Sequence, residues 1–309
     1  RLSYAYDLRV FFRFLQETNP ALMSKPMADI SIQDLSSLQP VDFEEFQEYL
    51  KAYKAPDNKL ETNSRTGIAR KMSCLRSFYD YLCKRQLIQS NPVRLVDMPK
   101  IKEKAIIQLD PDEVASLLDY IENYGNQLTG VKLYHYNKQK YRDIAIVTLL
   151  LGTGVRVSEL VGLNISDIDF KNNGIRILRK GGNEMIVYFG EEVEKALKDY
   201  LEISRNAITP LSGHEDALFL SGQRKRISVD AVEKMVKKYA SAVSAKTITP
   251  HKLRSTYGTA LYRETGDIYL VADVLGHADV NTTKKHYAKL SDARRRSASK
   301  AVVLREKTN

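Results

Sequence analysis

The 309-residue sequence has little cysteine, no tryptophan and no long apolar run. Its two cysteines, Cys74 and Cys83, form no CxxC pair, which excludes a disulfide framework and a zinc site built from cysteine pairs. The longest apolar run, IAIVTLLLG, is too short to span a bilayer. We therefore expect no membrane association and a reducing, cytoplasmic location. The sequence begins at Arg1 without a methionine or a signal-peptide pattern, which indicates a fragment or a processed form.

Acidic residues are in the minority. The chain has 48 lysines and arginines against 38 acidic residues, a formal net charge of +10. The excess is concentrated, because residues 284–309 hold nine basic against two acidic residues and residues 64–85 hold six against one. Charge that only keeps a protein soluble would be spread more evenly. This distribution therefore indicates a polyanionic partner such as nucleic acid.

The length of the chain predicts two domains. Residues 1–98 are predicted to form an all-helical domain, because apolar residues recur there at helical spacing in three stretches. Residues 99–107 lack such periodicity and lie just before a helix start at Asp110-Pro111, so they are the expected linker. Residues 108–290 are the expected second domain, and residues 291–309 a basic C-terminal tail.

The third helical stretch of the first domain, TNSRTGIARKMSCLRSFYDYLCKRQ, is apolar on one side and basic on the other. Its apolar residues are expected to face the core, which leaves Arg65, Arg70, Lys71 and Arg76 mostly elsewhere. A helix of this kind fits the major groove of DNA, so these four are candidate DNA-contact residues. The alternative is a solvated basic face on a helix that binds nothing.

The second domain mixes helices with a few strands. The stretch YRDIAIVTLLLGTGVRVSEL predicts a helix, a glycine turn and a second helix, and IRILRKGGNEMIVYF predicts a hairpin that turns at Gly181-Gly182. Three further helices are predicted downstream. The expected fold class is therefore mainly α with a small antiparallel β-sheet, an all-helical domain followed by a mixed α+β domain. Residues 123–141 fit neither pattern and are interpreted as an insertion without an assigned role.

Polar residues stand at the edges of these elements. They are Arg156 after a glycine turn, Lys180 in the hairpin turn, His251 and Arg254 as an HxxR pair, His277 in an LGH triplet, and Tyr287. Each motif alone is common on protein surfaces, and the GxG before Arg156 is too short for a nucleotide-binding loop. Their combination and their order along the chain are more informative.

In that order the set resembles the tyrosine recombinases, the superfamily of lambda-integrase and Xer-type recombinases. The resemblance covers nearly the whole chain and rests on TGVRVSEL, RKGGNEMIV, TPHKLRSTYGTAL and VLGHADVNTTKKHY, together with the helical basic domain before them. It implies that the catalytic residues are Arg156, Lys180, His251, Arg254, His277 and Tyr287, with Glu159 as a supporting acid behind them. It also implies a core-binding, SAM-like first domain that closes with the catalytic domain as a C-shaped clamp around DNA.

Two features depart from the family pattern. Many relatives have a histidine after the second arginine, where this chain has Ser255. The spacing from His277 to Tyr287 is one residue longer than in the shortest relatives, and Tyr257 and Tyr262 lie nearby in the sequence. Neither of these two tyrosines follows an LGH segment, so Tyr287 is the expected nucleophile.

The residue types suit phosphodiester chemistry. Planar guanidinium groups that donate two hydrogen bonds match the charge that develops on the non-bridging oxygens, and the histidines can add further donors. Lys180 is placed in the sequence to protonate the leaving 5′ oxygen. A tyrosine nucleophile keeps the bond energy in a phosphate ester, so the strand can be rejoined. No metal, nucleotide or other cofactor is expected, because no carboxylate cluster for two metal ions is present.

The resemblance also implies partners. They are a double-stranded recombination site with inverted-repeat half-sites on the bacterial nucleoid, three further copies of the chain in a tetramer held by exchange of the tail, and an accessory directionality factor. The alternative for the tail is a helix packed on its own protomer. The expected role is integration or excision of a mobile element. Alternatives are Xer-type resolution of chromosome dimers, a type IB topoisomerase and a catalytically silent DNA-binding regulator.

Overall fold

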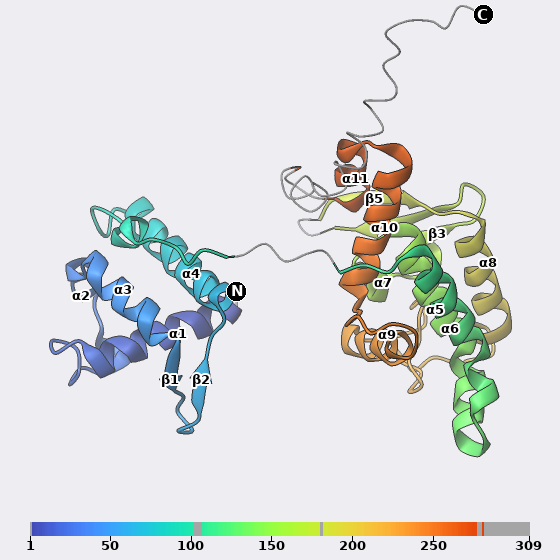
Figure 1. Cartoon of the computed structure of the whole chain (residues 1–309), viewed down its shortest axis with the longest axis horizontal. Helices are drawn as coiled ribbons and strands as arrows, with labels where there is room; N and C mark the ends of the chain where they lie inside the picture. The colour runs from blue at the N-terminus through green and yellow to red at the C-terminus, as the bar shows by residue number, and fades with distance from the viewer. Residues whose placement is uncertain (1, 102–106, 180–181, 277–279, 281–309) are drawn as a thin grey trace, which may run out of the picture. The chain divides into compact units, whose positions relative to one another are not determined.

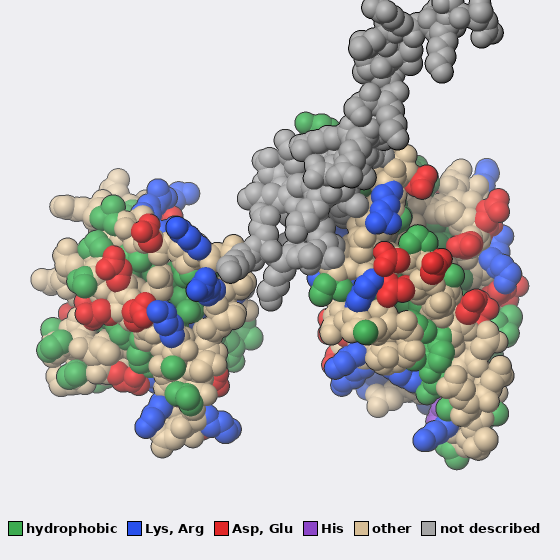
Figure 2. All heavy atoms as spheres, viewed as in Figure 1, with side chains coloured by type: hydrophobic (Ala, Val, Ile, Leu, Met, Phe, Trp, Pro, Cys, Tyr) green, Lys and Arg blue, Asp and Glu red, His purple; other side chains and the backbone are tan. Residues whose placement is uncertain are grey.

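The computed structural model describes residues 2–101, 107–179, 182–276 and 280. The chain divides into two compact units, residues 1–104 and residues 105–309 (Figure 1). Each unit has its own cluster of buried apolar side chains. On the faces seen in Figure 2, basic and acidic side chains are interspersed over both units. Among the described residues, none of the helices is both long enough and apolar enough to cross a membrane.

The first unit is mainly helical. Its elements are α1 (Leu2–Thr18), η1 (Met27–Asp29), α2 (Ile32–Ser37), α3 (Pro40–Tyr49), β1 (Ala52–Lys54), β2 (Leu60–Thr62), α4 (Arg65–Lys84) and η2 (Pro92–Leu95). The helices α1, α3 and α4 bury an aromatic core, in which the Phe11 ring stacks on Phe43 and meets Phe46 edge-on. The apolar stripes that predicted these helices are the faces that meet there.

The prediction that the first domain is all-helical was wrong at one place. Strands β1 and β2 pair in an antiparallel hairpin of three residue pairs, from Ala52 opposite Thr62 to Lys54 opposite Leu60. The turn between them contains Pro56 and a left-handed Asn58 (φ 61°), residues that favour tight turns. The strands are short and largely solvent-exposed, so no alternation of apolar and polar residues marked them in the sequence.

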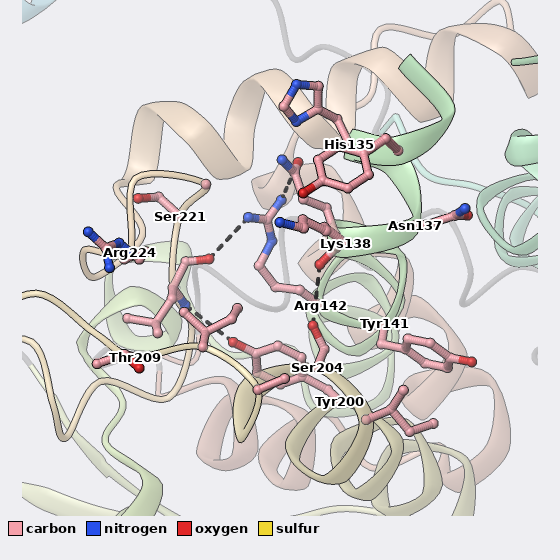
Figure 3. Close-up of a pocket in the computed structure, with 17 residues that line it drawn as sticks. His135, Asn137, Lys138, Tyr141, Arg142, Tyr200, Ser204, Thr209, Ser221 and Arg224 are labelled. Atoms are coloured by element: carbon pink, nitrogen blue, oxygen red, sulfur yellow. Dashed lines mark hydrogen bonds between the residues drawn. The ribbon is translucent and has the colours of Figure 1, made fainter. Parts of the chain in front are cut away.

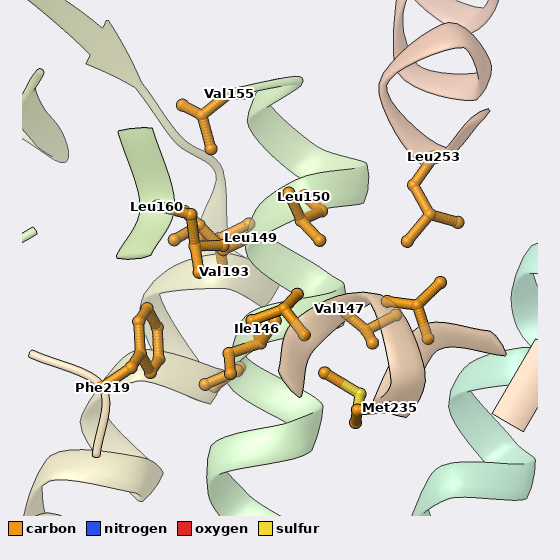
Figure 4. Close-up of a cluster of buried hydrophobic side chains, with 14 of the residues drawn as sticks. Ile146, Val147, Leu149, Leu150, Val155, Leu160, Val193, Phe219, Met235 and Leu253 are labelled. Carbon is orange, nitrogen blue, oxygen red and sulfur yellow. The ribbon is translucent and has the colours of Figure 1, made fainter. Parts of the chain in front are cut away.

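The second unit carries the mixed α+β architecture that was predicted. Its elements are α5 (Pro111–Asn123), η3 (Tyr124–Gln127), α6 (Gly130–Thr153), α7 (Val157–Gly162), η4 (Ile165–Asp167), β3 (Ile168–Asp169), β4 (Gly174–Leu178), β5 (Glu184–Tyr188), α8 (Glu191–Asp199), η5 (Tyr200–Arg205), α9 (Val229–Val243), α10 (Pro250–Thr265) and α11 (Ile268–Leu275). Helix α6 is central and packs against α5, α8 and α10. Figure 4 shows its apolar residues among side chains from α7, α8, α9 and α10.

The sheet of the second unit has the order β3-β4-β5 and is antiparallel throughout. Strand β4 pairs with β5 from Gly174 opposite Tyr188 to Leu178 opposite Glu184. The predicted hairpin is confirmed, and the Arg179 and Asn183 backbones close it with a 2.8 Å hydrogen bond from Arg179 N to Asn183 O. Gly182 has a φ of +88°, which only glycine adopts readily, and Gly181 lies outside the described residues.

Residues 123–141 are not an irregular insertion. They form the turn η3 and the first half of α6, which runs for 24 residues from Gly130 and extends beyond the body of the unit (Figure 1). Tyr136 anchors this extension, because its hydroxyl donates to the carbonyls of Ile121 (2.9 Å) and Glu122 (2.7 Å). Most other side chains there are exposed or half-buried, so the sequence contains no apolar stripe from which this part of the helix could be predicted.

Candidate active site

The predicted site residues fall into two groups. Arg156, Glu159, His251 and Arg254 are described by the structure. Lys180, His277 and Tyr287 lie outside the described residues.

Arg156 stands at the N-cap of α7, directly after the glycine turn that ends α6. Its backbone N–H donates to Glu159 Oε2 (2.8 Å), and its guanidinium Nη1 donates to Glu159 Oε1 (2.7 Å). The Glu159 side chain is buried, whereas 38% of the Arg156 side chain is exposed. One carboxylate thus fixes both ends of the arginine, and the guanidinium still reaches the surface.

Arg254 is buried on α10 and donates hydrogen bonds in two directions. Its Nη1 donates to the carbonyl of Gly154, and its Nη2 donates to the carbonyl of Leu275. Gly154 has a left-handed φ of 63°, and a side chain there would collide with the ring of Tyr257. The glycine therefore allows α6 to end close to α10, so that the Arg254 guanidinium can reach the carbonyl of Gly154.

The C-terminal end of helix α11 lies against these guanidinium groups. Arg156 Nη2 donates to the carbonyl of Gly276 (2.9 Å). Arg254 Nη2 donates to the carbonyl of the preceding residue, Leu275. The two arginines therefore hold consecutive carbonyls, although α7 and α10 are far apart in the sequence. The last carbonyls of a helix carry partial negative charge, which stabilises cations placed there.

His251 lies one helical turn before Arg254 on α10, at a spacing that puts both side chains on one side of the helix. Its side chain is exposed, and its backbone carbonyl accepts a 3.1 Å hydrogen bond from the Ser255 hydroxyl. Ser255 is the position at which many relatives have histidine. Pro250 at the first position of the helix and Thr249 at its N-cap set where α10 begins.

Sequence reasoning did not single out a third arginine at this place. Arg179, just after β4, donates from Nη2 to the carbonyl of Val274 (2.7 Å) and from Nη1 to the carbonyl of Asp273 (3.3 Å). It therefore occupies the two carbonyls of α11 that precede those held by Arg254 and Arg156. The only signal in the sequence was its position next to Lys180.

The cluster has more positive than negative charge. The pKa of the Arg179 guanidinium is lowered mainly by burial and also by the nearby charge of Arg156, while Glu159 and Asp273 act in the opposite direction. Among the described residues, the guanidinium groups of Arg156, Arg179 and Arg254 thus share the end of α11 with one buried carboxylate, that of Glu159. Such a group of preorganised donors is suited to an anion. In the described part of the chain, no three His, Cys, Asp or Glu side chains are grouped as metal ligands.

The candidate DNA-contact residues on α4 have different surroundings. Arg70 forms a bidentate pair with the buried Asp7, and Lys71 is itself buried and donates to Asn63 (2.8 Å). Arg76 donates to the carbonyls of Val93 and Val96, which ties η2 to α4. Arg65 is exposed at the start of the helix. A DNA contact by any of the four stays a prediction.

A cavity of about 710 Å³ lies elsewhere in the second unit, between the first half of α6, η5 and the loop around Ser221 (Figure 3). Arg142 points into it, and its guanidinium donates to Asp143, to Gln139 and to the carbonyl of Leu220. Tyr239 completes the group with a 2.9 Å bond to the other oxygen of Asp143. Because these polar groups satisfy one another, the cavity has the character of a structural network rather than of a second reactive centre.

Two family models match this sequence. The model of the phage integrase family matches residues 108–294, and the model of the phage integrase N-terminal SAM-like domain matches residues 1–86. A tyrosine recombinase XerC of Caldanaerobacter subterraneus is 35% identical over 309 aligned residues, which cover 96% of this chain and 79% of the relative. A tyrosine recombinase XerS of Streptococcus thermophilus is 33% identical, with 91% and 84% covered.

Solved structures are similar in fold. XerH recombinase bound to a palindromic difH substrate, in a post-cleavage complex, has a TM-score of 0.68 at 20% identity, covering 94% of this chain and 78% of that one. The Tn1549 transposon integrase in complex with transposon right-end DNA has a TM-score of 0.65 at 22% identity, with 96% and 99% covered. At these identities the likeness concerns the arrangement of the chain.

Proposed function

The chain belongs to the phage integrase family and is a tyrosine-type site-specific DNA recombinase, and we propose that it cuts and rejoins DNA strands one at a time through a covalent 3′-phosphotyrosine. The observation that carries this proposal is the group of guanidiniums at the end of α11. Arg156 and Arg254 come from separate helices, hold consecutive carbonyls and have charge in excess of the one buried carboxylate beside them.

In the proposed reaction the two arginines bind the non-bridging oxygens of the scissile phosphate. A guanidinium has five N–H donors, so the bonds of Arg156 to Glu159 and to the carbonyl of Gly276 leave others for the phosphate. The carbonyls and the carboxylate hold the groups in place before DNA arrives. Each preorganised donor of this kind stabilises a charged transition state by about 3 kcal/mol. His251 and His277 are proposed to add hydrogen bonds to the same oxygens.

The covalent step exchanges one phosphate ester for another. The Tyr287 oxygen attacks phosphorus and loses its proton, the bond from phosphorus to the 5′ oxygen breaks, and Lys180 gives a proton to that leaving oxygen. The product is a 3′-phosphotyrosyl linkage and a free 5′ hydroxyl. In the reverse step a 5′ hydroxyl, from the same strand or from a partner strand, attacks phosphorus and releases Tyr287. No net hydrolysis occurs, so the DNA is rejoined without an external energy source.

The proposed substrate is a double-stranded site with inverted-repeat half-sites, which is bound by both units and brought together in a tetramer of four protomers. The net charge of +10 favours such a polyanion. Exchange of the tail, residues 291–309, is proposed to connect the protomers, and an accessory protein is proposed to set direction. These assignments rest on the family resemblance.

Two biological roles fit this activity. The first is integration or excision of a mobile element, and the second is Xer-type resolution of chromosome dimers. The relatives that are 35% and 33% identical over most of this chain carry Xer names, and this observation favours the second role. Sequencing the DNA that becomes covalently attached to the protein in its own cells separates the two. A single chromosomal site is expected for the second role, and the ends of an element for the first.

The central proposal is tested with genomic fragments that contain the mapped site. Wild-type protein is expected to form a DNA adduct that survives denaturing detergent, with phosphate on the peptide that contains Tyr287. Tyr287→Phe is expected to form none, whereas Tyr269→Phe, which changes an exposed tyrosine of α11, serves as the matched control and should react normally. An adduct that persists in Tyr287→Phe rejects this nucleophile. Relaxation of supercoils without a specific site would instead identify a topoisomerase.

A further inference from the structure

The cavity of about 710 Å³ in the second unit has three walls, which are the first half of α6, η5 and the loop around Ser221 (Figure 3). Hydrogen bonds join these walls. Arg142 Nη1 donates to the carbonyl of Leu220 (3.0 Å), and the Ser204 hydroxyl donates to the carbonyl of Lys138 (3.3 Å). The walls are therefore fixed before any ligand binds, and the volume is within the range of about 300–1,000 Å³ that is typical of ligand sites.

The cations at the rim of this cavity are not balanced by acids. Lys138 on α6 and Arg224 on the loop are exposed, and neither has an ion-pair partner among the described residues. The Lys138 ammonium lies instead 4.5 Å from the centre of the Tyr134 ring. Arg142, at the floor, is already paired with Asp143, and no aspartate or glutamate is among the described residues that line the cavity. This charge favours an occupant that is negative.

Apolar side chains lie beside these cations. Ile203 of η5 is 52% exposed and Tyr134 of α6 is 55% exposed, although both line the cavity. Ile208, which follows η5, is half-buried in the same lining. Large apolar side chains that are exposed around a hollow mark a surface that binds another molecule. The occupant is therefore expected to have an apolar group as well as negative charge.

Two of the three walls have uncommon backbone conformations. The element η5 is a π-helix that directly continues α8, and Arg224 has a left-handed φ of 62° although it is not a glycine. π-Helical turns are rare and often occur at functional sites. A left-handed residue with a side chain costs free energy, and such residues cluster at sites with a function. The backbone therefore supports a role for this cavity beyond packing.

DNA is an unsuitable occupant of this cavity. At a rise of about 1.5 Å per residue, Arg142 and Tyr134 lie roughly 16 and 28 Å along α6 from Thr153, its last residue. Arg156, which is proposed to bind the scissile phosphate, follows that last turn of α6. The outside of a duplex also offers phosphates but no apolar side group that could enter a hollow. The cavity thus lies away from the phosphate site and has the wrong lining for a nucleic acid.

The tail of another protomer is also unsuitable. Residues 284–309 hold nine basic and two acidic residues, so the charge of the tail has the same sign as the charge of the rim. Like charges across an interface oppose association. The occupant is therefore expected to come from a protein of opposite charge.

We propose that this cavity docks an acidic segment of a partner protein, with an apolar side chain of the segment against Ile203 and Ile208 and its carboxylates at Lys138 and Arg224. The inference goes beyond the proposed recombination reaction and does not depend on it, because the cavity and the phosphate-binding arginines are at different ends of α6. It also gives a task to residues 123–141, which hold three lysines and no acidic residue.

The experiment starts from a library of short random peptides displayed on yeast, from which the labelled full-length protein selects binders. A parallel selection with Arg224→Glu protein removes peptides that bind elsewhere. Binding of the enriched peptides is then measured by fluorescence anisotropy with wild type, Lys138→Glu, Arg224→Glu and Ile203→Ser. Lys171→Glu is the matched control, because Lys171 is an exposed cation of the same unit that does not line the cavity. Thermal unfolding of each variant verifies that it is folded.

The enriched peptides are expected to contain several acidic residues and an apolar one, and to bind more weakly as salt is added. Lys138→Glu and Arg224→Glu should each weaken binding by about 10-fold or more, because attraction becomes repulsion between like charges. Ile203→Ser should weaken it by about 10-fold through the loss of apolar contact, and Lys171→Glu should bind like wild type. A peptide whose glutamate at Arg224 is replaced by lysine should regain affinity for Arg224→Glu protein.

Three results would overturn the inference. The first is that no peptide is enriched over the parallel selection, that the enriched peptides lack acidic residues, or that the cavity variants bind them like wild type. The second is a synthetic peptide of residues 291–309 that binds wild type and not the cavity variants, which would assign the cavity to the tail of another protomer. The third is a DNA duplex of random sequence whose binding is weakened by Lys138→Glu and Arg224→Glu but not by Lys171→Glu, which would identify the cations as DNA contacts.

Discussion

Arginines gather in both units of this protein, on α4 in the first and at the end of α11 in the second, but they are neutralised in different ways. On α4, Arg70 forms a bidentate pair with the buried carboxylate of Asp7, and the Lys71 ammonium lies 4.0 Å from the same carboxylate. At α11, Arg156 pairs with Glu159 and also donates to the carbonyl of Gly276, whereas Arg254 donates to the carbonyls of Gly154 and Leu275.

This difference in partners distinguishes arginines that stabilise the fold from arginines that are suited to bind an anion. A guanidinium with its own carboxylate is electrically complete and gains little from a phosphate, because binding would require breaking the existing pair. Guanidiniums held by carbonyls keep their full charge, since a carbonyl supplies only part of a negative charge. The number of cations relative to carboxylates is thus more informative than the density of basic residues.

The largest effect is expected at Arg254. Arg254→Lys keeps the charge but cannot donate to Gly154, to Leu275 and to a phosphate at once, so single-turnover cleavage should fall by about 100- to 1,000-fold. The measurement is the rate of adduct formation on saturating DNA. Arg263→Lys, in the exposed last turn of the same helix, is the control and should cleave normally. Wild-type cleavage by Arg254→Lys would show that α11 gathers arginines only for stability.

The next largest effect is expected at Glu159. Glu159→Gln keeps the size of the side chain but removes the ion pair with Arg156, so the guanidinium loses its fixed orientation. Cleavage should fall by about 10- to 100-fold, the scale on which small displacements of a reacting group act. The expected signature is a lower maximal rate with little change in DNA affinity. Asp230→Asn, which breaks an exposed pair with Lys234, should alter neither quantity.

Sequence reasoning was strongest where one residue pattern is enough to specify an element. The apolar stripe of α1, with Phe11 and Leu15 fully buried, and the glycine that ends α6 were visible as local signals. The first half of α6 was missed because Tyr136 is buried there by itself among more exposed neighbours, and one buried residue makes no stripe. The β1–β2 hairpin was missed because three exposed residue pairs have no periodicity to detect.

The family resemblance predicts the residue types of the site but not the contacts that hold them. Family resemblance pointed to Arg156, Arg254 and Glu159, and the structure brings the first two to consecutive carbonyls of α11. Arg179 could not be foreseen, because its partners are more than ninety residues away and are backbone atoms, which have no side-chain identity to recognise. On α4, the pattern of basic residues could not predict that Lys71 is buried, because the sequence does not show whether a lysine is exposed to solvent or paired inside the fold.

A smaller effect distinguishes the cations of α4 from one another. Arg70→Ala leaves the buried Asp7 without its bidentate partner, so the protein should lose about 1–3 kcal/mol of stability. Arg65→Ala, at an exposed position, should leave stability unchanged within about 0.5 kcal/mol. If Arg65 meets a phosphate, its loss should lower the slope of log affinity against log salt by about one. Thermal unfolding and DNA binding at several salt concentrations measure both quantities, and a salt slope lowered by Arg70→Ala instead would assign the DNA contact to Arg70.

The smallest effect concerns an ion pair far from either arginine group. The hydrogen bond from Lys246, followed by that from the Asp110 backbone, lowers the pKa of Glu113 from 4.5 to about 2. A lowered pKa means that the pair stabilises the fold above pH 4.5 and that this contribution is lost as the pH falls toward 2. Because the pair is near the surface, its contribution is under about 1 kcal/mol. Lys246→Met should therefore be slightly less stable than wild type in urea unfolding at pH 6, and the difference should shrink below pH 4.5 and disappear near pH 2. A difference that stays constant from pH 6 to pH 2 would mean that the methionine changes packing and not charge, and a difference that 1 M salt does not reduce would mean the same.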